Sequence, residues 1–454
     1  MTELFAETAL LPDGWAGNVA VTIGADGRIA GVAPGAEASG GAERVDVLLP
    51  AVANLHSHAF QRAMAGLTEA RGPSASDSFW TWRKLMYRFL DALTPDDVEA
   101  ITAFAQVEML EGGFASVCEF HYLHHAPGGA AYENLAEMSE RVAASAATTG
   151  IGLTLIPVLY QHGGCDGRAL TGGQQRFGND FDAYGALLEG AETALAPLGD
   201  ARIGLSAHSL RAVPPETIAA MAALRPDAPV HMHVAEQVAE VEEVEAAYGA
   251  RPITLTLDRL GADARWCLIH STQMTPDETE ALAASGAVAG LCPVTESSLG
   301  DGIFDGARYL AAGGRFGVGT DSNIRIAVAE ELRTLEYSQR LRDRARAVVA
   351  TRERTTGRVL YEGALAGGAQ AAGRRTGAIR PGAWADFVAL DAGAPDLVGV
   401  ARDMILDAFV FARGDRIDGV WSAGRKVVTG GRHIARAAVT ARYAATVRRL
   451  LADA

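Results

Sequence analysis

The chain has 454 residues, 49% of them apolar, and a formal net charge of −15. This length allows one large globular domain with a smaller one beside it. The acidic balance argues against nucleic acid or an anionic membrane as a partner, and no stretch approaches the ~20 apolar residues of a membrane-spanning helix.

The cysteines and the first residues bear on the cellular compartment. Four cysteines are scattered without C-x-x-C spacing, which favours reduced thiols over a disulfide framework. The opening "MTELFAETALLPDGW" lacks the basic segment and apolar core that are typical of a signal peptide. We therefore expect a cytoplasmic protein.

In chain order, the first element is a β region and the second alternates strands with helices. Residues 1–48 contain short alternating segments with glycine turns, such as "NVAVTIGADGRIAGVAP", which predict β-hairpins. Residues 49–375 then contain eight apolar strand-like runs: "PAVANLH", "ASVCEF", "GLTLIPVLY", "RIGLSAH", "PVHMHVA", "WCLIHS", "AVAGLCP" and "RFGVGTD". Helical patterns separate them, for example over residues 94–112, 134–150 and 329–350. Strands that alternate with helices predict a parallel (β/α)8 barrel.

The last region returns to β texture. Residues 376–430 include "GAIRPGAWADFVALD" and "DGVWSAGRKVV", and a helical tail follows from about Thr440. We therefore predict an α/β fold with two domains. A (β/α)8 TIM barrel spans residues 49–375, and a small β-sandwich domain is built from both chain ends, residues 1–48 and 376–454, including the C-terminal helix.

Polar side chains stand where the predicted barrel strands end, which is where active residues of such barrels lie. His56 and His58 close the first strand and, two residues apart, face the same way. Further strands end at His208, His233, His270 and Asp321. Any one of these histidines could be a satisfied interior residue. Together, three neutral imidazoles and a carboxylate suit Zn²⁺, with Fe²⁺ as the alternative.

These motifs resemble a known superfamily. The segments "LHSHAFQR", "HMHVAEQ", "LIHSTQ" and "GVGTDS" resemble the metal-dependent amidohydrolases, and the likeness extends over the whole chain. It implies that one divalent metal is held by His56, His58, His233 and Asp321. Binuclear relatives bridge two metals with a carboxylated lysine on a middle strand. The only lysines here are Lys84 and Lys426, which excludes that arrangement.

The resemblance also implies roles for acid–base residues. His270 and Asp321 would accept and orient the proton of the attacking water. Glu236, three residues after His233, would carry a proton to the leaving nitrogen. The alternative for Glu236 is a helix N-terminal carboxylate that the helix dipole stabilises. His231 would lie one layer deeper in the barrel.

A narrower resemblance concerns the substrate. The segments "NLHSHAFQRAMAGLTE", "SFWTWRKLMYRF", "CEFHYLHH", "AHSLRAV" and "CPVTESSLGDGIF" look like the N-formimino-L-glutamate iminohydrolase family. This implies hydrolysis of a small dicarboxylate, N-formimino-L-glutamate, to N-formyl-L-glutamate and ammonia in histidine degradation, by a homodimer. Arg83 and Arg211 would hold the carboxylates, because a guanidinium binds them through two bonds. The remaining polar contacts would come from Gln61, Tyr122 and His208.

Two rival functions stay open on the sequence. The segment "LCPVTESSLGDGIF" has Thr295 and Glu296 where nucleobase deaminases carry Ser-Asn. A deaminase or chlorohydrolase of a neutral nucleobase-like heterocycle would need an apolar pocket and no arginine. A catalytically silent scaffold would be expected to lack a ligand or an acid–base residue. Arg83 also has a plainer reading, since its aromatic helix could serve only for packing.

Overall fold

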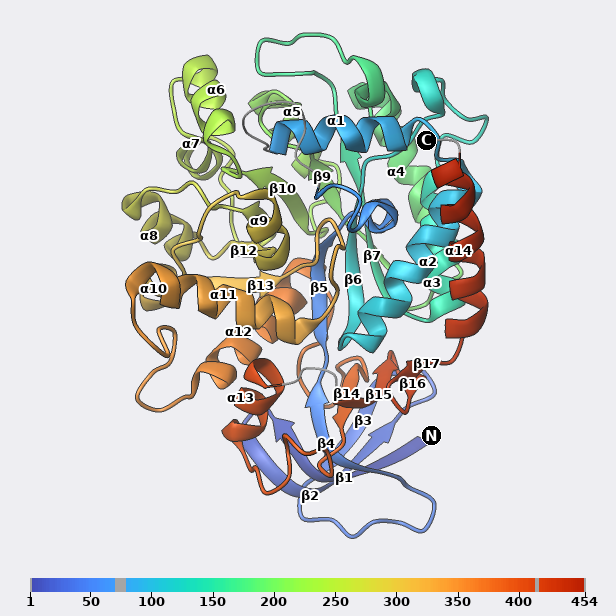
Figure 1. The fold of residues 1–454 in the computed structure, drawn as a ribbon, viewed down its shortest axis with the longest axis vertical. Helices are drawn as coiled ribbons and strands as arrows, with labels where there is room; N and C mark the ends of the chain where they lie inside the picture. The colour runs from blue at the N-terminus through green and yellow to red at the C-terminus, as the bar shows by residue number, and fades with distance from the viewer. Residues whose placement is uncertain (1, 70–78, 413–415, 453–454) are drawn as a thin grey trace.

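Eight parallel strands form the centre of the molecule. The computed structural model describes residues 2–69, 79–412 and 416–452 (Figure 1). The barrel strands are paired in chain order: β5 (Val52–Ser57), β6 (Phe114–His121), β7 (Gly152–Leu159), β9 (Leu205–Ala207), β10 (Val230–Val234), β11 (Trp266–His270), β12 (Val288–Leu291) and β13 (Arg315–Val318). A two-residue strand, β8 (Arg202–Ile203), also pairs with β7. Nearly all of their residues are buried, as expected for parallel strands covered on both faces.

The barrel closes between its first and last strands. Ser57 and Asp321 form a parallel bridge. The Asp321 amide donates to the His56 carbonyl at 2.9 Å, and the His58 amide donates to the Asp321 carbonyl at 2.9 Å. The predicted TIM-barrel fold is thereby confirmed, and its closing hydrogen bonds lie among the strand-end residues that the sequence singled out.

Helices surround the barrel, as Figure 1 shows. Those between or after the barrel strands are α1 (Phe79–Leu90), α2 (Pro95–Glu111), α3 (Glu137–Thr149), α4 (Phe181–Leu195), α5 (Pro215–Ala223), α6 (Val238–Tyr248), α7 (Pro252–Asp258), α8 (Pro276–Ser285), α9 (Pro293–Leu299), α10 (Gly306–Ala311), α11 (Val328–Asp343) and α12 (Thr356–Ala372). Short 3₁₀ turns are η1 (Ala59–Met64), η2 (Pro127–Gly129) and η3 (Gly172–Arg176). The local sequence explains where α2 begins. The Thr94 side chain accepts from the Asp97 amide, the Asp97 side chain accepts from the Thr94 amide, and Pro95 occupies the first helical position.

One helix is shorter than its pattern predicts. The apolar periodicity extends to residue 350, but α11 ends at Asp343 and Arg344 adopts a left-handed conformation with φ of 53°. The buried Glu336 carboxylate accepts from the amides of Val348 and Val349, at 2.8 and 3.2 Å. These bonds fold the chain back against the helix, so that the last residues of the pattern leave the helical path.

Both chain ends build a separate sheet below the barrel (Figure 1). Among the described residues it has eight strands in the order β17-β16-β15-β14-β4-β1-β2-β3. Their bounds are β1 (Thr2–Leu11), β2 (Gly14–Ile23), β3 (Ile29–Ala33), β4 (Glu43–Pro50), β14 (Phe387–Leu390), β15 (Ile417–Ser422), β16 (Arg425–Thr429) and β17 (Arg432–His433). Side chains from both ends, including Leu4, Val21, Leu48, Phe387 and Trp421, share one apolar core. The division of the chain into two domains at residues 48 and 376 stays a prediction.

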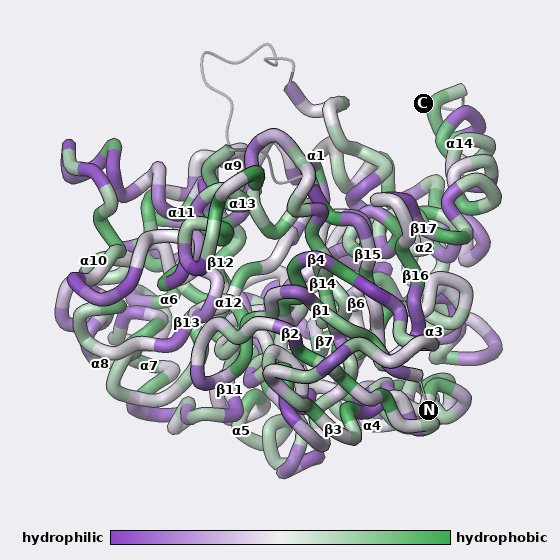
Figure 2. The backbone as a smooth tube through the Cα atoms, turned by 90° about the horizontal axis from the view of Figure 1, so that it is seen from below, coloured by the Kyte–Doolittle hydropathy of each residue, from purple (hydrophilic) through white to green (hydrophobic). Residues whose placement is uncertain are grey.

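The C-terminal helix lies against the barrel. Helix α13 (Asp403–Phe411) precedes the last strands, and α14 (Arg436–Ala452) then runs beside α2 (Figure 1). Tyr443 stacks on Phe104 of α2 with ring centroids 3.9 Å apart. Hydrophilic and hydrophobic segments alternate along α14 in Figure 2, as expected for a helix with one buried face. No helix in the described part of the chain is long and apolar enough to cross a membrane.

Candidate active site

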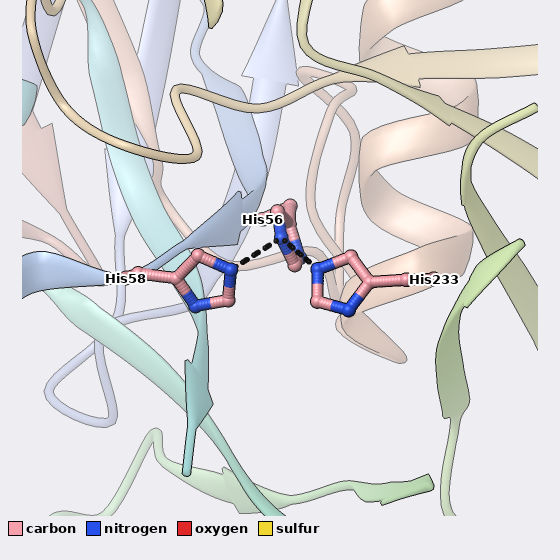
Figure 3. A group of neighbouring side chains, drawn as sticks. All are labelled: His56, His58 and His233. Atoms are coloured by element: carbon pink, nitrogen blue, oxygen red, sulfur yellow. Dashed lines mark hydrogen bonds between the residues drawn. The ribbon is translucent and has the colours of Figure 1, made fainter. Parts of the chain in front are cut away.

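Three imidazoles meet at the top of the barrel (Figure 3). The Nε2 atom of His56, on β5, lies 3.1 Å from Nε2 of His58 and 3.1 Å from Nε2 of His233, on β10. The Asp321 Oδ1 atom completes the group, 3.5 Å from His56 Nε2 and 3.2 Å from His58 Nε2. The structure therefore brings together the four side chains that the sequence predicted as metal ligands.

Hydrogen bonds to two of these rings leave their inner nitrogens unprotonated. His58 Nδ1 lies 3.0 Å from the Phe120 carbonyl, and His233 Nδ1 lies 3.1 Å from the His208 carbonyl. A carbonyl only accepts, so each Nδ1 carries the proton and each Nε2 presents a lone pair. Burial lowers the pKa of His56 to about 3, with His58 acting in the same direction. The rings are therefore neutral, as metal ligands must be.

The spacing of the donor atoms fits a small cation. Four ligands at about 2.0–2.1 Å around Zn²⁺ in a tetrahedron lie about 3.3 Å from one another. Four of the six separations among these donor atoms, at 3.1 to 3.5 Å, are close to this edge length. Burial would raise the pKa of Asp321, but the neighbouring histidines, His56 first among them, hold it below its usual range, so the carboxylate is ionised. One carboxylate and three neutral imidazoles thus form a donor set that fits a divalent metal.

The backbone at two strand ends is strained, and this strain aims the side chains. His270 and Asp321 have φ values of 72° and 42°, in the left-handed region that costs a non-glycine residue about 1–2 kcal/mol. Each residue therefore bends the chain where its strand ends. The bend directs both side chains inward, and His270 Nε2 lies 4.0 Å from Asp321 Oδ2.

Glu236 faces the same cluster from the turn after β10. Its Oε1 atom lies 3.8 Å from His270 Nε2, and burial raises its pKa to about 7. The turn itself is held by Glu240, whose carboxylate accepts from the amides of Ala235 and Glu236 at 3.1 and 2.9 Å. Since Glu240 binds the backbone at the start of α6, the side chain of Glu236 is left to the cavity.

A single cavity joins this cluster to the predicted substrate residues. The cavity, together with its opening to solvent, takes up about 510 Å³ above the barrel. Its walls include Gln61, Arg83, Tyr122, His208 and Arg211 together with His58, His233, Glu236, His270 and Asp321. The predicted site residues are thus all gathered here, with His56 buried directly beneath.

Helix α1 lies above the barrel strands in Figure 1, and it contributes Arg83 to the lining of the cavity. The Arg83 guanidinium donates to the Tyr160 hydroxyl at 3.1 Å and lies 5.3 Å above the centroid of Tyr87. Across the cavity, Arg211 follows β9 and is only 8% exposed. At the wall between them, the Gln61 amide donates to the Tyr122 hydroxyl at 2.8 Å. Two guanidinium groups thus line a cavity whose floor is a metal-type cluster.

Three further histidines lie outside the cavity, and one glutamate near His270 was not predicted to have a role. His231 binds the Ala371 carbonyl of α12 at 2.9 Å, so it belongs to the barrel interior. His124 and His125 bind backbone carbonyls at 3.0 and 2.7 Å and do not line the cavity. In the sequence, Glu296 is distinguished only by its place where nucleobase deaminases carry the Asn of a Ser-Asn pair. The structure places its carboxylate 3.3 Å from His270 Nδ1.

Comparison with known proteins agrees with this geometry. The model of the amidohydrolase family matches residues 47–427, and that of the N-terminal domain of formimidoylglutamate deiminase HutF matches residues 1–46. A formimidoylglutamate deiminase of Pseudomonas aeruginosa is 49% identical over 95% of this chain and 96% of that protein. The chain belongs to the formimidoylglutamate deiminase family of amidohydrolases.

Solved structures agree with this membership. An amidohydrolase from Brucella melitensis has a TM-score of 0.96 and 49% identity, and covers 99% of this chain and 100% of that one. An adenosine deaminase from Xanthomonas campestris, solved with bound zinc, has a TM-score of 0.82 at 22% identity, over 99% of this chain and 98% of that one. The second likeness shows the amidohydrolase fold alone, whereas the first, at 49% identity, extends over 99% of this chain.

Proposed function

We propose that the chain is a hydrolase that converts N-formimino-L-glutamate and water into N-formyl-L-glutamate and ammonia, a step of histidine degradation. The observation that carries this proposal is the single cavity that combines a metal-type cluster with two arginines, Arg83 and Arg211. The 49% identity to a formimidoylglutamate deiminase supports the same substrate. A heterocycle deaminase would gain nothing from two guanidinium groups beside a neutral ring.

The proposed cofactor is one divalent metal, Zn²⁺, held by His56, His58, His233 and Asp321. The donor spacing and the neutral state of the imidazoles support it. So does the zinc in the adenosine deaminase of the same fold. When bound, such a cation acts as a Lewis acid that lowers the pKa of a water molecule and polarises the reacting carbon.

The proton transfers are assigned to three side chains. Asp321 and His270, 4.0 Å apart, are proposed to take and orient the proton of the attacking water. Glu236, next to His270, is proposed to protonate the leaving nitrogen, because a carboxyl with a pKa of about 7 can both accept and donate near neutral pH. Water adds to the formimino carbon, and the bond from this carbon to the terminal nitrogen then breaks. The terminal nitrogen leaves as ammonium, and the carbon keeps the oxygen of the water as the formyl group.

Substrate recognition follows from charge. Each carboxylate of the substrate must exchange water for a fixed partner, and the guanidinium groups of Arg83 and Arg211 are proposed to supply two bonds each. Gln61, Tyr122 and His208 are proposed to bind its remaining polar atoms. The cationic formimino group would lie beside Glu236, whose carboxylate favours a positive charge. Metal and arginines thus hold opposite ends of one small molecule.

The test is ammonia release by the purified protein from a panel of compounds. The panel contains N-formimino-L-glutamate, its aspartate analogue, guanidino-glutamate, and cytosine, guanine and adenosine. Fast release from the first compound and none from the three heterocycles is expected. Release from a heterocycle alone would favour the rival deaminase. A cytoplasmic location and a homodimeric state stay predictions from the sequence.

A further inference from the structure

The segment after β12 contains a carboxylate to which the proposed mechanism assigns no task. Glu296 lies on α9 and is 5% exposed. Its Oε1 atom accepts from the Cys292 amide at 2.8 Å and lies 3.3 Å from His270 Nδ1. The nearby Cys292 thiol is a weak acceptor, and burial raises its pKa, so Glu296 is the strong acceptor at this face of the His270 ring.

The two nitrogens of His270 therefore face different groups. Nδ1 points to Glu296, while Nε2 lies 3.8 Å from Glu236 and 4.0 Å from Asp321. A carboxylate that accepts from Nδ1 keeps the proton on that atom and fixes the plane of the ring. The ring also stacks on His233, with centroids 5.5 Å apart, and its backbone is strained, with φ of 72°. Orientation by a third group is the arrangement that acid–base pairs in enzymes require.

We propose that Glu296 is a positioning residue that fixes the direction of the His270 ring, so that Nε2 faces the reacting water. The proposal deepens the proposed function and rests on it for the role of His270. The proposal also gives a role to Glu296 at the position where nucleobase deaminases carry Asn, because an asparagine side chain is shorter and uncharged. Glu296 itself is not among the residues that line the cavity.

The plainer reading is that Glu296 only binds the backbone at the start of α9, and the chain offers a matched control for it. Glu331 of α11 is 0% exposed, and its carboxylate accepts from the Val294 amide at 3.0 Å, at the start of the same helix. Glu331 is not among the ion-pair partners of His270. Substitution of each glutamate therefore removes a similar helix contact, but only one changes the surroundings of His270.

The experiment compares Glu296→Gln and Glu296→Leu with Glu331→Gln and Glu331→Leu in the metal-loaded protein. Glutamine keeps an oxygen acceptor and loses the charge, whereas leucine loses both. Loss of a hydrogen-bond partner that orients a metal-ligating imidazole typically costs about 10- to 100-fold, and the same scale is applied to His270. We expect kcat to fall about tenfold in Glu296→Gln and about a hundredfold in Glu296→Leu, with KM within about twofold. The Glu331 variants should lower the unfolding temperature similarly and leave kcat within about twofold of the wild type.

A second readout does not depend on turnover. In the imidazole ¹⁵N spectrum, assigned with His270→Asn, Nδ1 of His270 should carry a proton in the wild type and in Glu331→Gln. That proton should shift or move to Nε2 in Glu296→Leu. Equal kcat losses in the Glu296 and Glu331 variants, a change in KM alone, or an unprotonated Nδ1 in the wild type would each overturn the proposal. If the wild type releases no ammonia from N-formimino-L-glutamate, the proposed function fails, while the spectrum still decides the role of Glu296.

Discussion

Arg211 offers the sharpest test of the dicarboxylate substrate. Its side chain is 8% exposed, so it is already largely desolvated before substrate binds. A hydrogen bond that involves a charged group contributes about 1.5–3 kcal/mol, and about 1.4 kcal/mol corresponds to a factor of ten. We therefore expect Arg211→Ala to lower kcat/KM by about 10- to 150-fold. Much of this should appear as a higher KM, with some loss of kcat because a misplaced substrate also loses alignment.

The assay is a cycle of two enzymes and four substrates. Wild type and Arg211→Ala are compared on the diacid, on the two monoamides and on the neutral diamide of N-formimino-glutamate. If Arg211 holds one carboxylate, wild type and Arg211→Ala should have similar kcat/KM values on the monoamide that lacks this carboxylate and on the diamide. Arg83→Ala should show the reciprocal pattern with the other monoamide. Arg211→Lys should recover only part of the loss, because an ammonium cannot replace the planar fork of a guanidinium.

A buried arginine elsewhere in the chain serves as the control. Arg374 is 5% exposed and pairs with Asp200 and Asp386 at 3.3 and 3.5 Å. It lies beside Gly152, where β7 begins, and so at the opposite end of the barrel. Arg374→Met should lower the unfolding temperature and leave KM unchanged. If Arg211→Ala is kinetically silent, or weakens the diacid and the diamide equally, the dicarboxylate reading is wrong and a heterocycle substrate becomes the better hypothesis.

Four further predictions follow from the site and the fold. Elemental analysis should find one divalent metal per active chain, and two tightly held ions would contradict the single four-ligand set. Glu236→Gln should keep that metal and lose about 10²- to 10⁴-fold in kcat, and a rate near wild type would remove its proton-transfer role. His270→Asn should also keep the metal and lose activity, whereas loss of the metal would make His270 a ligand. Tyr443→Ala removes the stacking on Phe104 and should cost about 1–2 kcal/mol of unfolding free energy, measured in urea, with KM unchanged.

The sequence alone predicted the barrel and gathered the candidate site. Apolar runs that alternate with helical patterns indicate parallel strands, and in such a barrel all strand ends meet on one face. Residues as distant as His56, His233 and Asp321 could therefore be assigned to one site without coordinates. The lack of a lysine between Lys84 and Lys426 excluded a bridged metal pair in the same way, since it depends only on which side chains exist.

The tertiary structure was needed wherever the role of a polar side chain depends on which hydrogen-bond partner it reaches. Glu236 and Glu240 are both carboxylates near the start of α6, and only the three-dimensional turn shows that Glu240 binds the backbone amides and leaves Glu236 to the cavity. The early end of α11 depends on bonds from Glu336 to a segment that folds back. The pairing of Glu296 with His270 joins residues 26 positions apart. Periodicity and motif spacing report which face a residue occupies, but a hydrogen bond also requires the distance and direction that packing alone sets.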